Sequence, residues 1–512
     1  MLVKTFGSAI TGIEALLVTV EVSVELGVNF LLVGLPDNAV KESRERIATA
    51  ISQYGYHIPG KKVVINMAPA DVKKEGTAYD LTLAIGILAA AGHVKPEMLS
   101  EYVIMGELSL DGSLRPIKGA LPIAIEARKR HFKGIIVPSE NAREAAIVNN
   151  LNVHGADNLK QVIDFFNGEA ELPITSFDTR EEFAKGLNQY EFDFADVKGQ
   201  ESIKRALEIA AAGGHNVILI GPPGSGKTML AKRMPSILPP LSLEESLETT
   251  QIHSVAGKMK KEDALISVRP FRNPHHTVSD VALVGGGSNP QPGEISLAHN
   301  GVLFLDELPE FKRSVLEVLR QPMEDRKVTI SRAKMSTDYP ASFMLISAMN
   351  PCPCGYYNHP TIECTCAPGM VKKYMNKVSG PLLDRIDIQI EVVPVPFKEL
   401  ADKAPGEPSA AIRERVIKAR KIQSERFKNA QGIHCNAQMT SKLFREFCVL
   451  DSECKDLMKA AMDRLGLSAR AYDRIVKVAR TIADLDGAEN ITVMHLSEAI
   501  NYRSLDRDSW GR

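Results

Sequence analysis

The sequence predicts an α/β protein made of three successive parts, and two observations support this division. Strand-length apolar runs alternate with helix-length segments as far as residue 400, whereas the pattern from residue 411 onward is helical only. The resulting parts are an α/β domain over residues 1–168, a second α/β domain over 191–400 and an α-helical domain over 411–512. Residues 169–190, which include Pro173 and several acids, are expected to link the first two domains.

The composition is typical of a globular protein that folds in water. The 512 residues allow two to four domains, and 44% hydrophobic and 24% charged residues are ordinary proportions. A net charge of -1 gives no overall positive field, so a nucleic acid would have to meet local basic patches. No apolar run approaches the roughly 18 residues of a membrane span, and the first residues lack a signal-peptide pattern. We therefore expect a cytoplasmic protein without a membrane partner.

The first domain has the pattern of a mixed α/β unit. Residues 18–24 alternate apolar and polar side chains, as a strand with one buried face does. The predicted strands are 18–24, 29–33 and 62–66, and the predicted helices are 38–54, 81–91 and 121–129. No motif in these elements demands catalysis by itself.

A glycine-rich loop in the second domain lies between an apolar run and a helix. The loop Gly221-Pro-Pro-Gly-Ser-Gly-Lys-Thr228 follows the strand-like run 216–220 and precedes good helix formers. Glycines let backbone N–H groups turn toward phosphate oxygens, and the helix N-terminus adds positive potential. We expect Lys227 to reach the β- and γ-phosphates of ATP and Thr228 to hold Mg²⁺. The predicted nucleotide contacts are Gly221, Pro222, Pro223, Gly224, Ser225, Gly226, Lys227, Thr228, Met229 and Asp306.

Another apolar strand ends in two acids. Residues 301–305 are Gly-Val-Leu-Phe-Leu, and Asp306 and Glu307 follow at the end where open α/β sheets bind ligands. We expect Asp306 to support Mg²⁺ and Glu307 to polarise the attacking water. The alternative is an ordinary solvated acidic turn, which the complete phosphate loop upstream disfavours.

Two further residues gain a role from a resemblance to AAA+ ATPases. The strand-like run 342–349 ends at Asn350, which matches the polar residue that senses the γ-phosphate in AAA+ enzymes. The segment Gly380-Pro-Leu-Leu-Asp-Arg-Ile-Asp387 resembles the arginine-finger segment of the magnesium-chelatase and MCM branch, and Arg385 matches the finger. Such an arginine completes the site of a neighbouring subunit. A structural ion pair is the alternative role for Arg385.

The front domain resembles the proteolytic domain of Lon-type proteases. The resemblance rests on segments 73–81, 106–112 and 116–119. Lon-type proteases have a nucleophilic serine in the first segment, and this sequence has Ala78 at that position. Their lysine base follows the last segment, and the corresponding position here falls near Ile123. Lys118 lies close to the lost lysine position. Without the serine, we expect a protease-like fold that lacks protease activity and serves as a scaffold or docking domain.

The longest motifs resemble the ComM/YifB group of bacterial magnesium-chelatase-like AAA+ ATPases. They include Arg269-Pro-Phe-Arg-Asn-Pro-His-His-Thr277 and the stretches 285–287, 292–299, 305–311 and 350–355, and the resemblance spans nearly the whole chain. It implies a homo-oligomeric ring, a hexamer, that uses ATP and Mg²⁺. The ring would act on single-stranded and branched DNA during recombination of incoming strands in natural transformation, beside recombination proteins.

The same resemblance places two hairpins in the pore of the ring. One has the glycine-rich stretch 285–293 as its tip, and the other consists of 326–334 and the strand that follows. In the second hairpin, Arg332 and Lys334 are expected to contact DNA phosphates. A solvated edge strand with charged side chains is the alternative.

A cluster of cysteines follows Asn350 closely. The four are Cys352, Cys354, Cys364 and Cys366. Four thiolates on a short loop suit structural Zn²⁺ in tetrahedral geometry and leave no open position for catalysis. His359 is an alternative ligand, and a reducing compartment disfavours disulfides.

Two other groups of residues need an assignment. His275 and His276 are expected to be packing or interface residues, because adjacent histidines point apart on most backbones. The C-terminal part resembles the helical lid of AAA+ proteins, with predicted helices 412–429, 440–447, 452–465, 469–485 and 493–501. Arg470 matches the lid arginine that points at the γ-phosphate in this family, and Arg474 competes for that role.

The sequence therefore favours an ATP-dependent DNA motor that promotes branch migration or helicase action. The residues expected to take part in hydrolysis are Lys227, Glu307, Asn350, Arg385 and Arg470. The alternatives are a magnesium-chelatase-type subunit that drives metal insertion and a protein-remodelling ATPase. The front domain and the cysteine loop favour the DNA motor.

Overall fold

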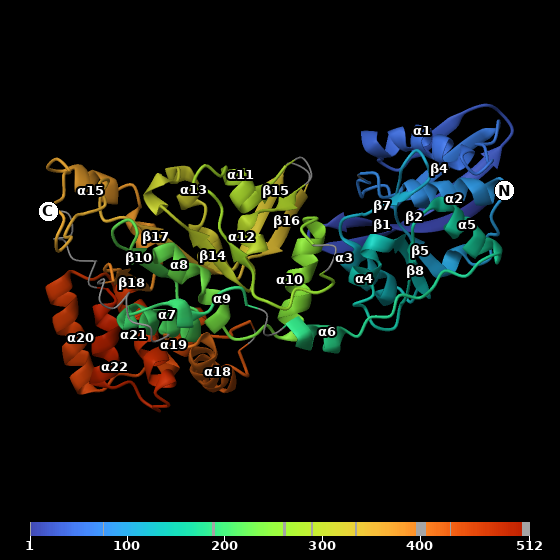
Figure 1. The fold of residues 1–512 in the computed structure, drawn as a ribbon. Helices are drawn as coiled ribbons and strands as arrows, with labels where there is room; N and C mark the ends of the chain where they lie inside the picture. The colour runs from blue at the N-terminus through green and yellow to red at the C-terminus, as the bar shows by residue number, and fades with distance from the viewer. Residues whose placement is uncertain are drawn as a thin grey trace.

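Three parts of the chain follow one another along the molecule. The computed structural model describes residues 2–74, 76–186, 190–259, 263–287, 290–332, 335–395, 406–430 and 432–503. Figure 1 shows the front domain at one end, the core sheet in the middle and the C-terminal helices beside the core sheet. Among the described residues, no helix is both long and apolar enough to cross a membrane.

The front domain is built on a seven-stranded mixed sheet in the order β3-β4-β2-β1-β5-β8-β9. β2 pairs antiparallel with both β1 and β4, and the remaining pairings are parallel. The strands are β1 Leu2–Thr11, β2 Glu14–Glu25, β3 Phe30–Val33, β4 Lys62–Ala68, β5 Tyr102–Ile104, β8 Gly134–Pro138 and β9 Asn152–Ala156. The short strands β6 Glu107–Leu108 and β7 Leu114–Arg115 form a separate hairpin.

The helices of the front domain cover this sheet. They are α1 Asn38–Ser52, α2 Asp80–Ala90, α3 Ala120–Lys129, α4 Ser139–Ala145 and α5 Leu159–Asn167. All residues of α2 are buried, because the helix packs against β1 and β2. The three strands and three helices predicted from the sequence are confirmed, whereas β1, β5, β8 and β9 were not predicted. The helix α6 Thr179–Gly186 lies within the predicted linker.

The core domain has a five-stranded, fully parallel sheet in the order β11-β14-β17-β10-β18. Its strands are β10 Val217–Ile220, β11 Phe271–Arg272, β14 Val302–Leu305, β17 Met344–Met349 and β18 Ile388–Glu391. β10, β14 and β17 are entirely buried, as strands covered on both faces must be. The three predicted strands are therefore confirmed: β10 precedes the phosphate loop, β14 precedes the two acids and β17 precedes Asn350. Because all five strands run in parallel, their carboxyl ends meet at one edge.

Helices surround the core sheet. They include α7 Glu201–Gly213, α8 Lys227–Lys232, α9 Met234–Ile237, α13 Arg313–Glu317, α14 Arg320–Asp325, α15 Met370–Met375 and α16 Gly380–Leu383. Short 3-10 turns lie at Leu99–Glu101, Phe194–Asp196, Leu308–Glu310 and Asn436–Gln438.

The segment between α9 and β15 carries the additional elements of the core. These are α10 Leu243–Val255, α11 Asp280–Val284, β12 Gly285–Gly286, β13 Gln291–Pro292 and α12 Glu294–Leu297. β12 pairs with β13, and β15 Lys327–Arg332 pairs with β16 Met335–Pro340, so both predicted hairpins are confirmed as antiparallel pairs. Arg332 is the last residue of β15, and only its backbone is described. Its side chain and the whole of Lys334 lie outside the described residues.

The C-terminal part is helical, as predicted. Its helices are α18 Ser409–Arg426, α19 Ser441–Phe447, α20 Ser452–Leu465, α21 Ala469–Leu485 and α22 Val493–Asn501. The Ser468 side chain accepts a hydrogen bond from the N–H of Ala471 and thereby caps the N-terminus of α21. Buried residues of these helices share one apolar core with α7 and β10. The helical part is thus packed on the core sheet.

Candidate active site

The glycine-rich loop connects β10 to α8 at the carboxyl edge of the core sheet. Gly224 and Gly226 have φ of +77° and +88°, the left-handed region that favours glycine. The Nζ atom of Lys227 folds back over this loop, 2.8 Å from the carbonyl oxygens of both Gly221 and Pro222. The loop therefore has the turn and the lysine position of a phosphate-binding loop.

Lys227 also connects the loop to β17, the strand beside β10 in the sheet. Its Nζ lies 3.2 Å from Oδ1 of Asn350, which directly follows β17. Burial lowers the pKa of Lys227, and the nearby carboxylates of Asp306 and Glu307 act in the opposite direction. A phosphate in this position would replace the neutral oxygens that now accept from the ammonium, and would favour its charged form.

Thr228 and Asp306, the two residues expected to hold Mg²⁺, lie in direct contact. Thr228 Oγ1 donates a hydrogen bond of 2.6 Å to Oδ2 of Asp306. The other carboxylate oxygen accepts from the N–H of Glu307 at 3.0 Å. Hard oxygen donors on two neighbouring elements fit a partly hydrated Mg²⁺, which binds through one or two carboxylates and substrate phosphates.

Glu307 projects away from its strand because of an unusual backbone. Its φ of +53° lies in the left-handed region, which costs energy in a residue with a Cβ and is found most often at functional sites. The side chain is 58% exposed, so its carboxylate is open to solvent at the edge of the sheet. This position suits a group that must meet a water molecule.

His276 faces Glu307, which the sequence did not lead us to expect. Nδ1 of His276 lies 3.5 Å from Oε2 of Glu307. The rings of His275 and His276 lie side by side with centroids 4.1 Å apart, so the expectation that the two histidines point apart is wrong. His275 instead contacts Thr277 Oγ1 at 2.9 Å.

The strand β11 explains this placement. It pairs in parallel with β14, with Arg272 opposite Leu303, so the chain that follows it emerges beside the acids that follow β14. Arg272 is fixed by two contacts to the carboxylate of Glu294, at 2.6 and 2.8 Å. The position of His276 therefore depends on strand order and not on local sequence.

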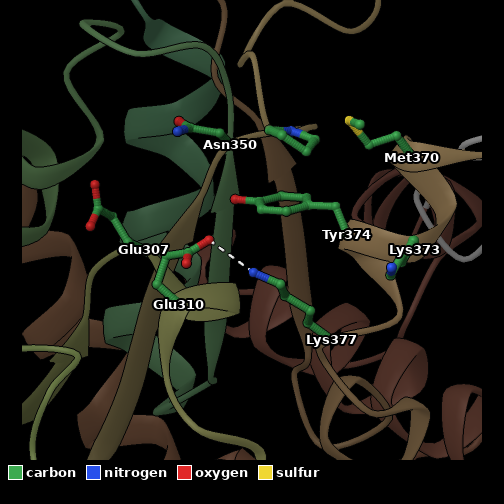
Figure 2. Close-up of a pocket in the computed structure, with 8 residues that line it drawn as sticks. Glu307, Glu310, Asn350, Met370, Lys373, Tyr374 and Lys377 are labelled. Atoms are coloured by element: carbon green, nitrogen blue, oxygen red, sulfur yellow. Dashed lines mark hydrogen bonds and ion pairs between the residues drawn. The ribbon is translucent and has the colours of Figure 1, made fainter. Parts of the chain in front are cut away.

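A cavity of about 370 Å³ opens beside Glu307 and Asn350. Figure 2 shows Glu307 and Glu310 on one side and the residues of α15 and its C-terminal end on the other. The Nζ atom of Lys377 lies 3.2 Å from Oε1 of Glu310, and burial raises the pKa of Tyr374. The remaining lining residues are Pro353, Met370 and Lys373. The end of the site that would hold the γ-phosphate is therefore bordered by basic and aromatic side chains that the sequence analysis missed.

Arg385 lies far from the phosphate loop of its own chain. It precedes β18, whose first residue pairs with Val217 at the start of β10, whereas the loop follows the last residue of β10. Arg385 is thus at the amino edge of the sheet. Its guanidinium is buried, 2.7 Å from Oε1 of Glu324 and 2.7 Å from the carbonyl oxygen of Pro381. The structural ion pair considered from the sequence is present.

The two lid arginines differ in their contacts. Nη1 of Arg474 lies 2.8 Å from Oδ1 of the buried Asp387. Burial alone would raise the pKa of Asp387, but Arg474, His215 and the N–H of Asn216 outweigh it and hold that pKa well below its usual range. Arg470 is exposed, and among the described residues no hydrogen bond or ion pair to its side chain is seen. Arg470 is therefore the lid arginine that is available for a ligand.

The four cysteines after Asn350 come together in space. The sulfur atoms of all four lie within 4.8 Å of one another, and Cys352 Sγ is 3.3 Å from Cys354 Sγ and 3.8 Å from Cys364 Sγ. Nδ1 of His359, the alternative ligand, accepts from the N–H groups of Thr361 and Ile362 instead. The loop lies against the phosphate loop, because a Cβ on Gly355 would be 2.5 Å from Pro223.

Comparison with known proteins identifies the family. The family profile described as "Magnesium chelatase, subunit ChlI" matches residues 193–400, "Subunit ChlI of Mg-chelatase" matches 20–141, and "Magnesium chelatase, subunit ChlI C-terminal" matches 406–503. "Uncharacterized protein YifB" of Escherichia coli is 46% identical over 98% of this chain and 96% of its own. "Competence protein ComM" of Haemophilus influenzae is 43% identical over 98% of this chain and 97% of its own. The chain belongs to the ComM/YifB family of magnesium-chelatase-like AAA+ proteins.

The front domain of this ComM/YifB family member is related in part to a protease. "Lon protease 2" of Bacillus subtilis is 31% identical over 28% of this chain and 27% of its own. The expected serine position is Ala78, and Ile123 is buried in the front-domain core. Lys118 is exposed, and its aliphatic stem lies close to Gly257 of the core domain. The partial similarity to a Lon protease supports the Lon-like fold expected for this domain.

The AAA+ fold brings together most of the residues predicted for nucleotide chemistry. Lys227, Thr228, Asp306, Glu307 and Asn350 meet at the carboxyl edge of one sheet. Arg385 lies at the opposite edge, and Arg470 lies on the helical part. The neighbours of Glu307 were not predicted, although the histidine pair 275–276 and the lysines Lys372, Lys373 and Lys377 are visible in the sequence.

Proposed function

We propose that this protein hydrolyses ATP and uses the energy to move DNA. The observation that supports this most strongly is the convergence of Lys227, Thr228, Asp306, Glu307 and Asn350 at the carboxyl edge of one parallel sheet. Phosphoryl transfer needs positioned charge more than covalent chemistry, and these are the groups that supply it.

The chemical roles follow from the geometry. Lys227 binds the β- and γ-phosphates, and the loop N–H groups bind phosphate oxygens. Thr228 and Asp306 would hold Mg²⁺, which neutralises phosphate charge when it is bound. Glu307 polarises the attacking water, and Asn350 orients that water against the γ-phosphate.

The proposal includes a ring of identical subunits, a hexamer. Arg385 lies at the amino edge of the sheet and cannot reach the phosphate loop of its own chain, which supports a role in the site of a neighbour. Such an arginine would stabilise charge that develops in the transition state. Arg470, exposed on α21, would approach a γ-phosphate in the same assembly.

DNA is the proposed track for the motor. A relative with 43% identity is named a competence protein, which supports action on incoming single strands and branched DNA during recombination in natural transformation. The hairpins β12–β13 and β15–β16 are the proposed pore elements, and Arg332 and Lys334 of the second would contact phosphates. Recombination proteins are the partners that this role implies, in the cytoplasm.

A structural zinc ion is the proposed occupant of the cysteine cluster. Zn–S bonds of about 2.3 Å in a tetrahedron separate the sulfurs by about 3.8 Å. The sulfurs of Cys352, Cys354 and Cys364 lie 3.3 to 3.8 Å apart and all four lie within 4.8 Å of one another, which supports such an ion. Cys352, Cys354, Cys364 and Cys366 would provide all four ligands. The ion would then fix the loop between Asn350 and the phosphate loop.

The Lon-like front domain is proposed to lack protease activity. Ala78 offers no nucleophile, and Ser–Lys chemistry needs both partners. A casein or peptide cleavage assay with purified protein tests this directly.

A magnesium-chelatase-type subunit that drives metal insertion remains the second candidate function, because the family profiles carry that description. The effect of DNA on ATP turnover distinguishes the two functions. If the protein is a DNA motor, adding single-stranded or branched DNA should raise ATP turnover several-fold. Replacing Arg332 and Lys334 by alanine should reduce that stimulation and weaken the salt dependence of DNA binding. ATP turnover without DNA should stay unchanged in this double variant. Turnover that DNA leaves unchanged would favour the chelatase-type subunit.

A further inference from the structure

The turn between β1 and β2 of the front domain touches the second hairpin of the core. This turn consists of Gly12 and Ile13, since Thr11 pairs with Glu14. Ile13 packs against the apolar cluster of the core domain that contains Val328, Ile330 and Tyr339. Figure 1 shows β1 extending from the front domain toward β15 and β16.

The backbone approach at this contact is very close. Gly12 has φ of +65°, and a Cβ built on it would lie only 2.8 Å from Cγ2 of Thr337 in β16. Thr337 pairs with Ile330, and the pair Arg332–Met335 is the last described before the hairpin turn. The contact therefore supports the hairpin two residues before Arg332 along β15.

A second contact, through α10, fixes the front domain to the core. The Ser254 hydroxyl donates to the buried carboxylate of Glu144 in α4, and the N–H of Gly119 donates to the Ser254 carbonyl at 3.1 Å. Leu247 of α10 and the nearby Leu265 pack against the apolar core of the front domain. The front domain thus meets the core at two separated contacts, the β1–β2 turn and α10.

We infer that the Lon-like domain is a brace that holds the β15–β16 hairpin in position, with Gly12 and Ile13 as its positioning residues. This inference rests on the proposal that the hairpin grips DNA. A two-stranded hairpin alone is marginally stable in water. Val328, Ile330 and Tyr339 anchor one side of this hairpin in the core cluster, and the front-domain turn adds a second support at Thr337 of β16. With its outer strand held by the brace, the hairpin transmits movements of the nucleotide site to the DNA backbone.

The test compares Ile13→Ser with the conservative Ile13→Leu in the full-length protein. Hydrogen exchange of the hairpin amides, measured without DNA, should become about tenfold faster in Ile13→Ser and stay near the parental rate in Ile13→Leu. Half-maximal stimulation of ATP turnover should need about tenfold more DNA in Ile13→Ser, while turnover without DNA stays within twofold of the parent. Leu110→Ser, which removes an exposed leucine elsewhere on the front domain, is the matched control and should change neither.

A pair of substitutions at the close approach gives an independent readout. Gly12→Ala should speed hairpin exchange because its Cβ meets the Thr337 methyl group. Thr337→Ser removes that methyl group and should restore part of the protection in the double variant. Rescue would not occur if Gly12→Ala acted only through strain in its own turn.

The outcomes separate the brace from the DNA proposal. Unchanged hairpin exchange in both Ile13→Ser and Gly12→Ala overturns the brace, whatever the DNA result. Faster exchange with unchanged DNA stimulation also overturns it, because the hairpin would then not need support to act. A parent protein that neither binds nor responds to DNA contradicts the proposed function, while the exchange data still decide whether the front domain holds the hairpin.

Discussion

His276 and Glu307 face one another across the carboxyl ends of β11 and β14, with Nδ1 and Oε2 3.5 Å apart. Among the residues that the structure describes, the Glu307 side chain has no other hydrogen bond or ion pair, and its backbone has a left-handed φ of +53°. The imidazole is thus placed to limit the directions that the carboxylate can take. It would keep Glu307 aimed at the site of the attacking water.

Replacing His276 by alanine should therefore slow the chemical step. We expect kcat for ATP hydrolysis to fall about five- to tenfold with little change in KM, since the phosphate contacts stay intact. Steady-state ATP turnover measures both. His275→Ala is the matched control, because that ring lies beside His276 but contacts Thr277, and it should stay within twofold of the parent. Equal losses in the two variants would contradict the positioning role.

Arg385 should act across a subunit boundary. Mixing an Arg385→Ala chain with a Lys227→Ala chain should restore part of the ATP turnover, because some interfaces then regain a complete site. Each variant alone should be nearly inactive. The measurement is turnover as a function of mixing ratio. Mixtures that never exceed the sum of the separate variants would argue for a site contained in one chain.

Purified protein should contain about one zinc per chain. Cys352→Ser and Cys364→Ser should each lower that content strongly, and they should slow ATP turnover because the loop begins two residues after Asn350. Cys448→Ala removes a buried thiol outside the cluster and should keep the metal. Metal analysis by mass spectrometry, on protein purified under reducing conditions without chelators, decides the matter. Finding no zinc in the parent would exclude this assignment.

Asp387 should stabilise the protein in a pH-dependent way. Its pKa is lowered in the folded state, so its stabilising effect is fully present above the unfolded value of about 3.9 and is lost as pH falls through the folded value. Asp387→Asn should cost about 3 kcal/mol at pH 7, because it leaves Arg474 without its buried partner. Urea unfolding at several pH values measures the difference between the two proteins. That difference should shrink below about pH 4, and a difference independent of pH would contradict the ion pair as its cause.

The parts of the site that follow one another along the chain were predictable, whereas contacts between distant segments were not. The order strand, glycine loop, helix is local, and so are the acids after β14 and Asn350 after β17. The contact of His276 with Glu307 depends on β11, a strand of two residues whose neighbour in the sheet is decided by the whole fold. Periodicity in the sequence does not reveal such a pairing.

The missed strand β1 has a similar explanation. Its buried positions include Thr5 and Ser8, so the alternation of apolar and polar residues is broken. The Thr5 hydroxyl is satisfied by the carbonyl oxygen of Thr82 at 3.2 Å, and Gly7 gives space to the Tyr79 ring. Buried polar and small residues of this kind are intelligible only once their partners in and next to α2 are known.

Strand displacement from a four-way DNA junction, measured at low salt with the parent protein beside Glu307→Gln, tests the central claim most directly. Glutamine keeps the shape of Glu307 but removes the carboxylate, so the variant should bind ATP and the junction while its hydrolysis falls by a factor on the order of a hundred or more. The parent should displace strands only with hydrolysable ATP, and Glu307→Gln should displace none. A parent protein that turns over ATP yet neither binds nor displaces the junction, or a Glu307→Gln protein that displaces strands at the parental rate, would contradict that claim.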